Sequence, residues 1–202
     1  MQTETETEQE TKNGSYAFKG PTSTQIEFLE DLKKYDPLFK SAISGSQYVI
    51  VSDGAGHYAE DKVGGAATVV LSLMDLDTHP NFLIKAQNQT TVMRMEFEGL
   101  LMGLEHIQRD ENFYPGCNVL WLCDNKTLID LVNLEGKPKK NEDLWCLYHF
   151  YERNLNVRGV FIPRDNKMLL HNLCDLHAST SREILLDYIQ TSVEFTYGEE
   201  KS

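Results

Sequence analysis

The stretch VLWLCD at residues 119–124 decides the fold that the sequence predicts. Five successive apolar residues are typical of a strand that is buried on both faces in the centre of a sheet. This run ends at Asp124, and a second, largely apolar run, YVIVS at residues 48–52, is followed in the same way by Asp53. Residues just beyond adjacent strand ends converge on one edge of an α/β sheet. We therefore expect Asp53 and Asp124 to lie close together.

Further strands and helices surround these two runs. Residues 64–71 and 82–86 have strand patterns and short connections, which predict an antiparallel meander with the first strand. The segment GAG at residues 54–56 is expected to be a turn. The sequence also predicts a strand at 157–162 and helices at 92–107, 126–133, 141–154 (with Asn141 as the N-cap) and 169–190. This order of elements predicts an α/β domain.

Composition restricts the classes of function. The chain has 202 residues, with 19 Lys and Arg against 31 Asp and Glu, so its formal net charge is −12. This acidity argues against a protein that coats nucleic acid electrostatically, but it allows an enzyme that uses bound metal ions and a local basic patch. No run approaches the roughly 20 apolar residues that a membrane span needs. The polar, acidic start is unlike a signal peptide, so we expect a cytoplasmic protein.

Four regions are expected along the chain. Residues 1–20 read as an acidic disordered tail, 21–46 as a helical extension, 47–193 as the main domain and 194–202 as an acidic C-terminal tail. The extension is interpreted as a helix packed on the main domain, and the alternative is an appendage that binds a partner. A protein partner could use this extension or the acidic surface of the domain.

Four carboxylates are candidates for chemistry. Asp53 and Asp124 follow strands, whereas Glu96 and Asp175 lie near the starts of predicted helices that can pack across the same sheet edge. Four carboxylates share a small site only if cations neutralise them, and Mg²⁺ or Mn²⁺ prefers such oxygen ligands. Two ions about 3.5–4 Å apart would act on a phosphodiester. The alternative is that the two aspartates are ordinary turn residues.

Several motifs together point to one family. They are VSDGA at 51–55 followed by GGAA at 64–67, TVMRME at 91–96, LWLCDN at 120–125, KNEDLW at 140–145 and CDLHA at 174–178. In this order they resemble the motifs of ribonuclease H of type 1, and the resemblance covers roughly residues 48–186.

The resemblance implies both a fold and an activity. The implied fold is RNase H-like, with a mixed five-stranded sheet flanked by helices. The implied site holds two Mg²⁺ ions, or Mn²⁺, on Asp53, Glu96, Asp124 and Asp175. The implied activity is an endonuclease that cuts the RNA strand of an RNA–DNA hybrid. Two alternatives remain: a nuclease of the same fold that acts on another nucleic acid, such as an exonuclease or a structure-specific nuclease, and a binding or scaffold module without catalysis.

Three residues near the implied site need separate interpretation. Glu98 lies two residues after Glu96, about 200° around a helix, so only one of them can face the site; the motif favours Glu96, and Glu98 is expected to be solvated. Many family members carry a catalytic histidine in a glycine-rich loop, which this chain lacks. Arg164 occupies that region and is expected either to contact a phosphate or to pair with Asp165. His171 lies one helical turn before Asp175 and either assists proton transfer or product release, or simply packs or caps.

Substrate contacts are predicted at two places. Backbone groups around Gly54, Ala55 and Asn125 are expected to contribute to 2′-hydroxyl recognition in the minor groove. A second group of candidates is a cluster of lysines before the helix at 141–154, which either contacts phosphates or is a solvated loop; it consists of Lys137, Lys139 and Lys140.

Overall fold

The computed structural model describes residues 25, 28–31, 37–56, 62–76, 78–134, 140–164 and 168–198. Its strands are β1 (Tyr48–Gly56), β2 (Gly64–Ser72), β3 (Asn81–Gln87), β4 (Cys117–Cys123) and β5 (Leu155–Phe161). Its helices are α2 (Pro37–Ser44), α3 (Val92–Gln108), α4 (Lys126–Asn133), α5 (Glu142–Glu152) and α6 (Leu169–Gly198). Within these described residues, no helix is long and apolar enough to cross a membrane.

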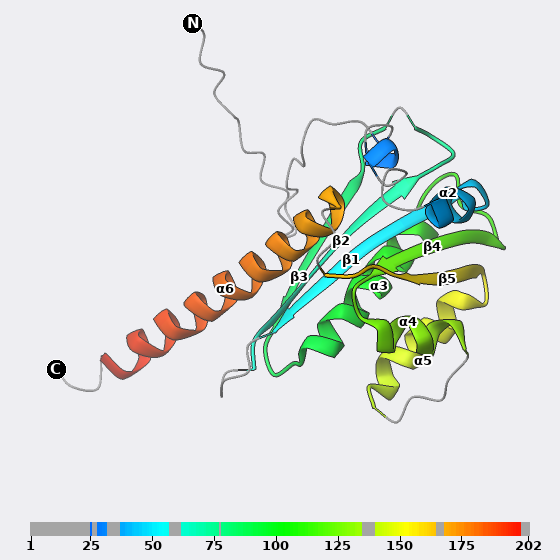
Figure 1. The fold of residues 1–202 in the computed structure, drawn as a ribbon. Coiled ribbons are helices and arrows are strands. Elements are labelled where there is room, and N and C mark those ends of the chain that lie inside the picture. The colour runs from blue at the N-terminus through cyan, green and yellow to red at the C-terminus, as the bar shows by residue number, and fades with distance from the viewer. Residues whose placement is uncertain are drawn as a thin grey trace, which may run out of the picture.

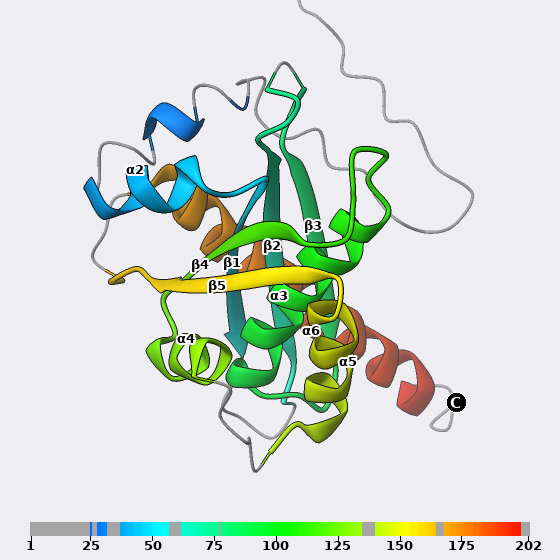
Figure 2. The same ribbon diagram turned by 90° about the vertical axis from the view of Figure 1, so that its right-hand side faces the viewer.

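The five strands form one mixed sheet in the order β3-β2-β1-β4-β5. The first three strands form an antiparallel meander, whereas β4 runs parallel to both β1 and β5. Helices α3 and α5 cover one face and α6 covers the other (Figures 1 and 2). This architecture confirms the predicted mixed five-stranded sheet flanked by helices.

Successive apolar side chains of the central strands point to opposite faces of the sheet, so each face has a hydrophobic core. In β1, Tyr48 and Ile50 point into the core on the α3 side, and Val49 and Val51 point into the core on the α6 side. Strand β4 is buried on both faces, as its apolar run predicts. Trp145, in α5, packs in the α3-side core.

The N-terminal extension shares the core on the α6 side. Phe28 and Leu29, together with Ala42 and Ile43, are buried in it. The buried Gln25 donates to the carbonyl of Asp75 at 2.8 Å and accepts from the backbone nitrogen of Ser72 at 2.6 Å. The described part of the extension therefore packs on the main domain.

Two predicted element boundaries are wrong. The segment 54–56 is not a turn, because it continues β1 and pairs with residues 64–66 of β2. The last helix does not end at Gln190 but continues to Gly198, so residues 194–198 are helical where the sequence suggested a tail. The other described boundaries differ from the prediction by a few residues at most.

Candidate active site

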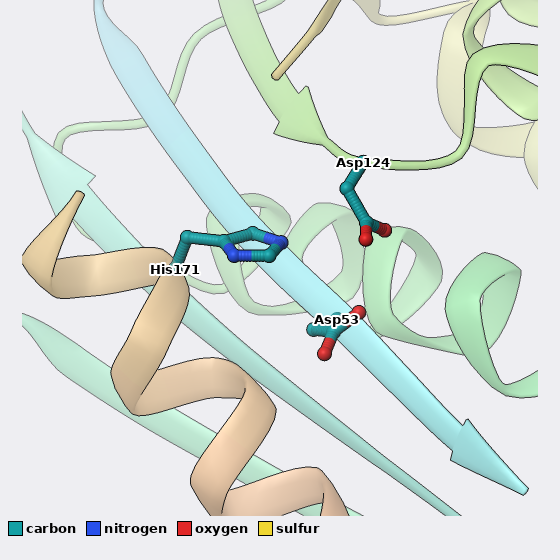
Figure 3. Close-up of side chains that lie close together, drawn as sticks. All are labelled: Asp53, Asp124 and His171. Carbon is teal, nitrogen blue, oxygen red and sulfur yellow. The ribbon is translucent and has the colours of Figure 1, made fainter. Parts of the chain in front are cut away.

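Asp53 and Asp124 lie side by side because β1 and β4 are parallel neighbours. The last register pair of these strands joins Val51 and Leu122, and each aspartate stands two residues beyond that pair. Both side chains are largely buried, since Asp53 is 6% exposed and the Asp124 side chain 3%. One oxygen of each carboxylate and one ring nitrogen of His171 all lie within 4.8 Å of one another (Figure 3).

Glu96 reaches this edge because α3 packs very closely on β1. A Cβ atom at Gly54 would overlap the backbone of Glu96, so only glycine allows this approach. The Thr91 hydroxyl caps the helix by accepting from the backbone nitrogen of Arg94 at 3.2 Å. Glu96 itself is buried, and its Oε2 accepts a hydrogen bond from the side-chain amide of Asn125.

Asp175 comes from the opposite side of the sheet, one turn after His171 in α6. It is exposed, and it is not among the three residues whose ligand atoms lie within 4.8 Å of one another. Its charge nevertheless contributes to raising the pKa of Asp53, as does that of Glu96. The structure therefore brings Asp53 and Asp124 together, and the charges of Glu96 and Asp175 are near enough to act on Asp53.

The charges of the cluster are poorly compensated by the described residues. Burial and the charge of Asp124 raise the pKa of Asp53 to about 8. Burial also raises the pKa of Glu96 to about 7, although the Asn125 hydrogen bond lowers it. Within the described part of the chain, Oδ1 of Asp124 and Nε2 of His171 are buried and have no hydrogen-bond partner. Unpartnered buried acceptors among carboxylates fit a divalent cation.

Two polar side chains complete the surroundings of Asp124. Arg164 donates from Nε to Oδ2 of Asp124 at 2.6 Å, so its ion pair is with a site carboxylate; Asp165, the other partner considered, lies outside the described residues. His171 is 5% exposed, and burial lowers its pKa despite the nearby charges of Asp124 and Asp175. Its imidazole is therefore neutral at neutral pH and keeps a lone pair available.

The predicted substrate-contact residues differ in their exposure to solvent and in their hydrogen bonds. Gly54 is buried under α3, and Ala55 is partly exposed. Asn125 is the N-cap of α4, where its Oδ1 accepts from the backbone nitrogen of Leu128 at 3.1 Å while its amide holds Glu96. Lys140 is exposed, and Lys137 and Lys139 lie outside the described residues.

The expectation that Glu98 is solvated is wrong. Glu98 is 7% exposed, and its carboxylate accepts from Nζ of Lys85 at 2.8 Å. This contact depends on the side chain of Lys85 reaching from β3 to α3, which sequence spacing along the helix does not show. Glu98 thus points away from Asn125, the partner of Glu96, so of the two glutamates only Glu96 faces the site.

A second ion pair, which the sequence analysis missed, connects two of the quoted motifs. Arg94 of α3 forms a two-pronged contact with the carboxylate of Asp143 in the first turn of α5. Arg94 and Asp143 each lie inside one of the quoted motifs, and this was the only indication in the sequence that they could be partners. Asn141 stands at the N-cap position of α5, but its side chain makes no capping hydrogen bond because its backbone is left-handed, with φ of 58°. The predicted side-chain cap is therefore wrong.

Comparison with solved structures identifies the fold. No protein-family model and no curated protein sequence matches the chain. The N-terminal RNase H domain of rv2228c from Mycobacterium tuberculosis aligns with a TM-score of 0.59 and 16% identity, over 70% of this chain and 97% of that one. LC11-RNase H1, isolated from compost by a metagenomic approach, aligns in its complex with an RNA/DNA hybrid with a TM-score of 0.57 and 18% identity, over 69% and 99% of the two chains. The chain has the RNase H-like fold.

Proposed function

We propose that the chain is a metal-dependent endonuclease that hydrolyses the RNA strand of RNA–DNA hybrids. The observation that carries the proposal is the buried, unpartnered Oδ1 of Asp124, which lies beside Asp53, a carboxylate on which the charges of Glu96 and Asp175 also act. A binding module gains nothing from burying repelling carboxylates, whereas a site for cations requires them. The RNase H-like fold, and the hybrid bound by one structural relative, support the choice of substrate.

The four carboxylates would hold two Mg²⁺ or Mn²⁺ ions. Bound ions would supply an activated water at neutral pH and neutralise the charge that develops on the phosphodiester. Hydrolysis between phosphorus and the 3′-oxygen would leave a 3′-hydroxyl and a 5′-phosphate. The residues that present the ligands are rigid, since Asp53 and Asp124 extend central strands and Asn125 fixes Glu96.

Arg164 is well placed to meet the substrate. Its side chain is 78% exposed although its Nε contacts the buried Asp124. One edge of the guanidinium therefore holds the site carboxylate while its other donors face solvent, where they can contact a phosphate oxygen. In a chain with net charge −12, such local cations must supply the attraction, and Lys140 is a second exposed candidate.

The test is a direct assay with the purified full chain. End-labelled RNA–DNA hybrid, double-stranded RNA, double-stranded DNA and single strands are offered in parallel with Mg²⁺, Mn²⁺ or a chelator. We expect internal cleavage of RNA in the hybrid alone, and none with chelator. Cleavage of another nucleic acid would identify a different nuclease of this fold. Hybrid binding without any cleavage would support the non-catalytic alternative.

A further inference from the structure

His171 is buried at the candidate active site without the partner that a core histidine normally has. The residue is 5% exposed, and its Nε2 is buried with no hydrogen bond to any part of the chain that the structure describes. Burying an unpaired polar atom is costly, so such an atom in a native protein calls for a water molecule, a ligand or an ion as its partner. Figure 3 shows the ring reaching from α6 toward the space between Asp53 and Asp124.

The position of the ring is built into the fold. His171 stands in the first turn of α6, whose start is held by Asp31, because Oδ2 of Asp31 accepts from the backbone nitrogen of Leu169 at 3.1 Å. One turn later, the thiol of Cys174 donates to the carbonyl of Val51 at 3.2 Å. These contacts fix the helix against the N-terminal extension and β1, so the imidazole is presented to the carboxylates by rigid elements rather than by a loop.

We infer that His171 is a metal ligand, which together with Asp53 and Asp124 forms a site that selects first-row transition ions over Mg²⁺. One ligand atom from each residue lies within 4.8 Å of the other two, so the three atoms surround one point where an ion can lie. Imidazole nitrogen suits Zn²⁺ and other late first-row ions such as Co²⁺, whereas Mg²⁺ prefers oxygen ligands and keeps its waters. The inference rests on the proposed function for the presence of a cation at these carboxylates, and it adds the class of ion.

The charge distribution around Asp124 agrees with a single ion on this side of the cluster. Arg164 occupies Oδ2 of Asp124, so that Oδ1 is the oxygen left for the ion. Asp53 supplies a second carboxylate, and the imidazole adds a donor without adding charge. Three protein ligands then leave coordination positions for water, which is the arrangement of catalytic rather than structural metal sites.

The test measures metal binding by the full chain in the absence of nucleic acid. Co²⁺, Zn²⁺ and Mg²⁺ are titrated into the wild type and His171→Gln, which replaces the nitrogen donor by an amide oxygen. His177→Gln, on the same helix but outside the cluster, is the matched control. We expect His171→Gln to weaken Co²⁺ and Zn²⁺ binding at least about tenfold and Mg²⁺ binding less than about threefold. Equal Co²⁺ affinity in the wild type and His171→Gln would overturn the inference.

A second measurement uses the wild-type protein, so its result does not depend on whether a variant folds. In wild-type chain labelled with ¹⁵N-histidine, Zn²⁺ should shift the ring nitrogen resonances of His171 at one equivalent of metal. Unchanged His171 signals at saturation would refute coordination. Failure of this inference is distinguishable from failure of the proposed function. If the chain cleaves the hybrid but the His171 resonances do not respond to metal, only the inference is refuted. If His171 coordinates the metal but no nucleic acid is cleaved, only the proposed nuclease function is refuted.

Discussion

Nε of Arg164 lies 2.6 Å from Oδ2 of Asp124, and the pair joins an arginine side chain that is 78% exposed to a carboxylate that is 3% exposed. The contact is possible because the segment after β5 stays beside the end of β4, where the backbone nitrogen of Ile162 donates to the carbonyl of Cys123 at 3.0 Å. Arg164 is therefore the cation that the described chain itself places on the carboxylate cluster. It offsets one charge of the cluster and leaves the other oxygen of Asp124 free.

Arg164→Gln should separate catalysis from metal binding. Removing the guanidinium takes a positive charge away from the candidate metal site and frees Oδ2 of Asp124, so metal affinity should rise. Hybrid cleavage should nevertheless fall about tenfold to a hundredfold, because a donor to the reacting phosphate is lost. Isothermal titration with Mn²⁺ and initial cleavage rates measure the two effects. Arg164→Lys, which keeps the charge, is the control, and weaker metal binding in Arg164→Gln would contradict this role.

The raised pKa of Asp53 predicts a pH-dependent stability of the metal-free protein. The folded state holds the proton of Asp53 up to about pH 8, whereas an unfolded chain releases it near 3.8. The folded state thus binds more protons, so the free energy of unfolding should decrease as pH rises from about 4 to about 8. Asp53→Asn abolishes this titration, and its melting temperature should exceed that of the wild type increasingly between pH 5 and pH 8.

Metal ions should reverse this pH dependence. Ions bind the deprotonated carboxylates, so the rise in melting temperature on adding Mn²⁺ should be larger at pH 8 than at pH 6. Differential scanning fluorimetry of both proteins, with and without metal, measures all these quantities. A wild-type protein whose metal-free stability increases steadily from pH 5 to pH 8, relative to Asp53→Asn, would contradict the electrostatics described above.

Asn125 has two separable roles, capping α4 and holding Glu96. Asn125→Ser keeps a capping oxygen but cannot reach Glu96, so its melting temperature should stay within a few degrees of the wild type while hybrid cleavage falls about tenfold. Asn125→Ala loses the cap as well, which costs about 1 kcal/mol of stability. Thermal denaturation and cleavage rates of the two variants distinguish the roles. Full cleavage activity in Asn125→Ser would show that the hydrogen bond to Glu96 has no catalytic consequence.

The same substitution should affect stability at Glu98 and catalysis at Glu96. Glu98→Gln weakens the contact with Lys85 and should lower the melting temperature by a few degrees, corresponding to about 1 kcal/mol, while cleavage remains within about threefold of the wild type. Glu96→Gln should abolish most cleavage with little loss of stability. Cleavage assays on variants whose folding has been verified by circular dichroism measure this contrast, and equal loss of cleavage in both would refute the assignment of Glu96.

Much of the fold could be predicted from local sequence because the central strands carry strong signals. The run at residues 119–123 is apolar on both faces, its counterpart at 48–52 is largely so, and each leads into an aspartate. Since parallel neighbours share one carboxyl edge, the proximity of Asp53 and Asp124 could be expected if the two strands were neighbours, and β1 and β4 are indeed adjacent and parallel. The Gly64–Ser72 strand was equally clear, although the continuation of β1 through Gly54 was not, because glycine in a sequence usually indicates a turn.

What could not be predicted depends on contacts between distant elements. The burial of Glu98 requires Lys85 from β3, and the ion pair of Asp124 requires Arg164 from the segment after β5. The direction of the His171 side chain toward the carboxylates depends on how α6 packs on β1. The spacing between His171 and Asp175 along the helix does not determine this packing. Side-chain partners of this kind follow from tertiary packing, whereas sequence periodicity reports only which face of an element is buried.

The most direct test of the central claim is the rate of hybrid cleavage by Asp124→Asn. The substitution keeps the shape of the side chain at a buried strand end but removes one charge from the proposed metal site. Cleavage measured with Mg²⁺ or Mn²⁺ should fall by at least about a thousandfold, since activation of water and charge stabilisation each supply several kcal/mol. Binding of an uncleaved hybrid should persist. A variant that binds and cleaves the hybrid within about tenfold of the wild-type rate would contradict the metal-dependent nuclease.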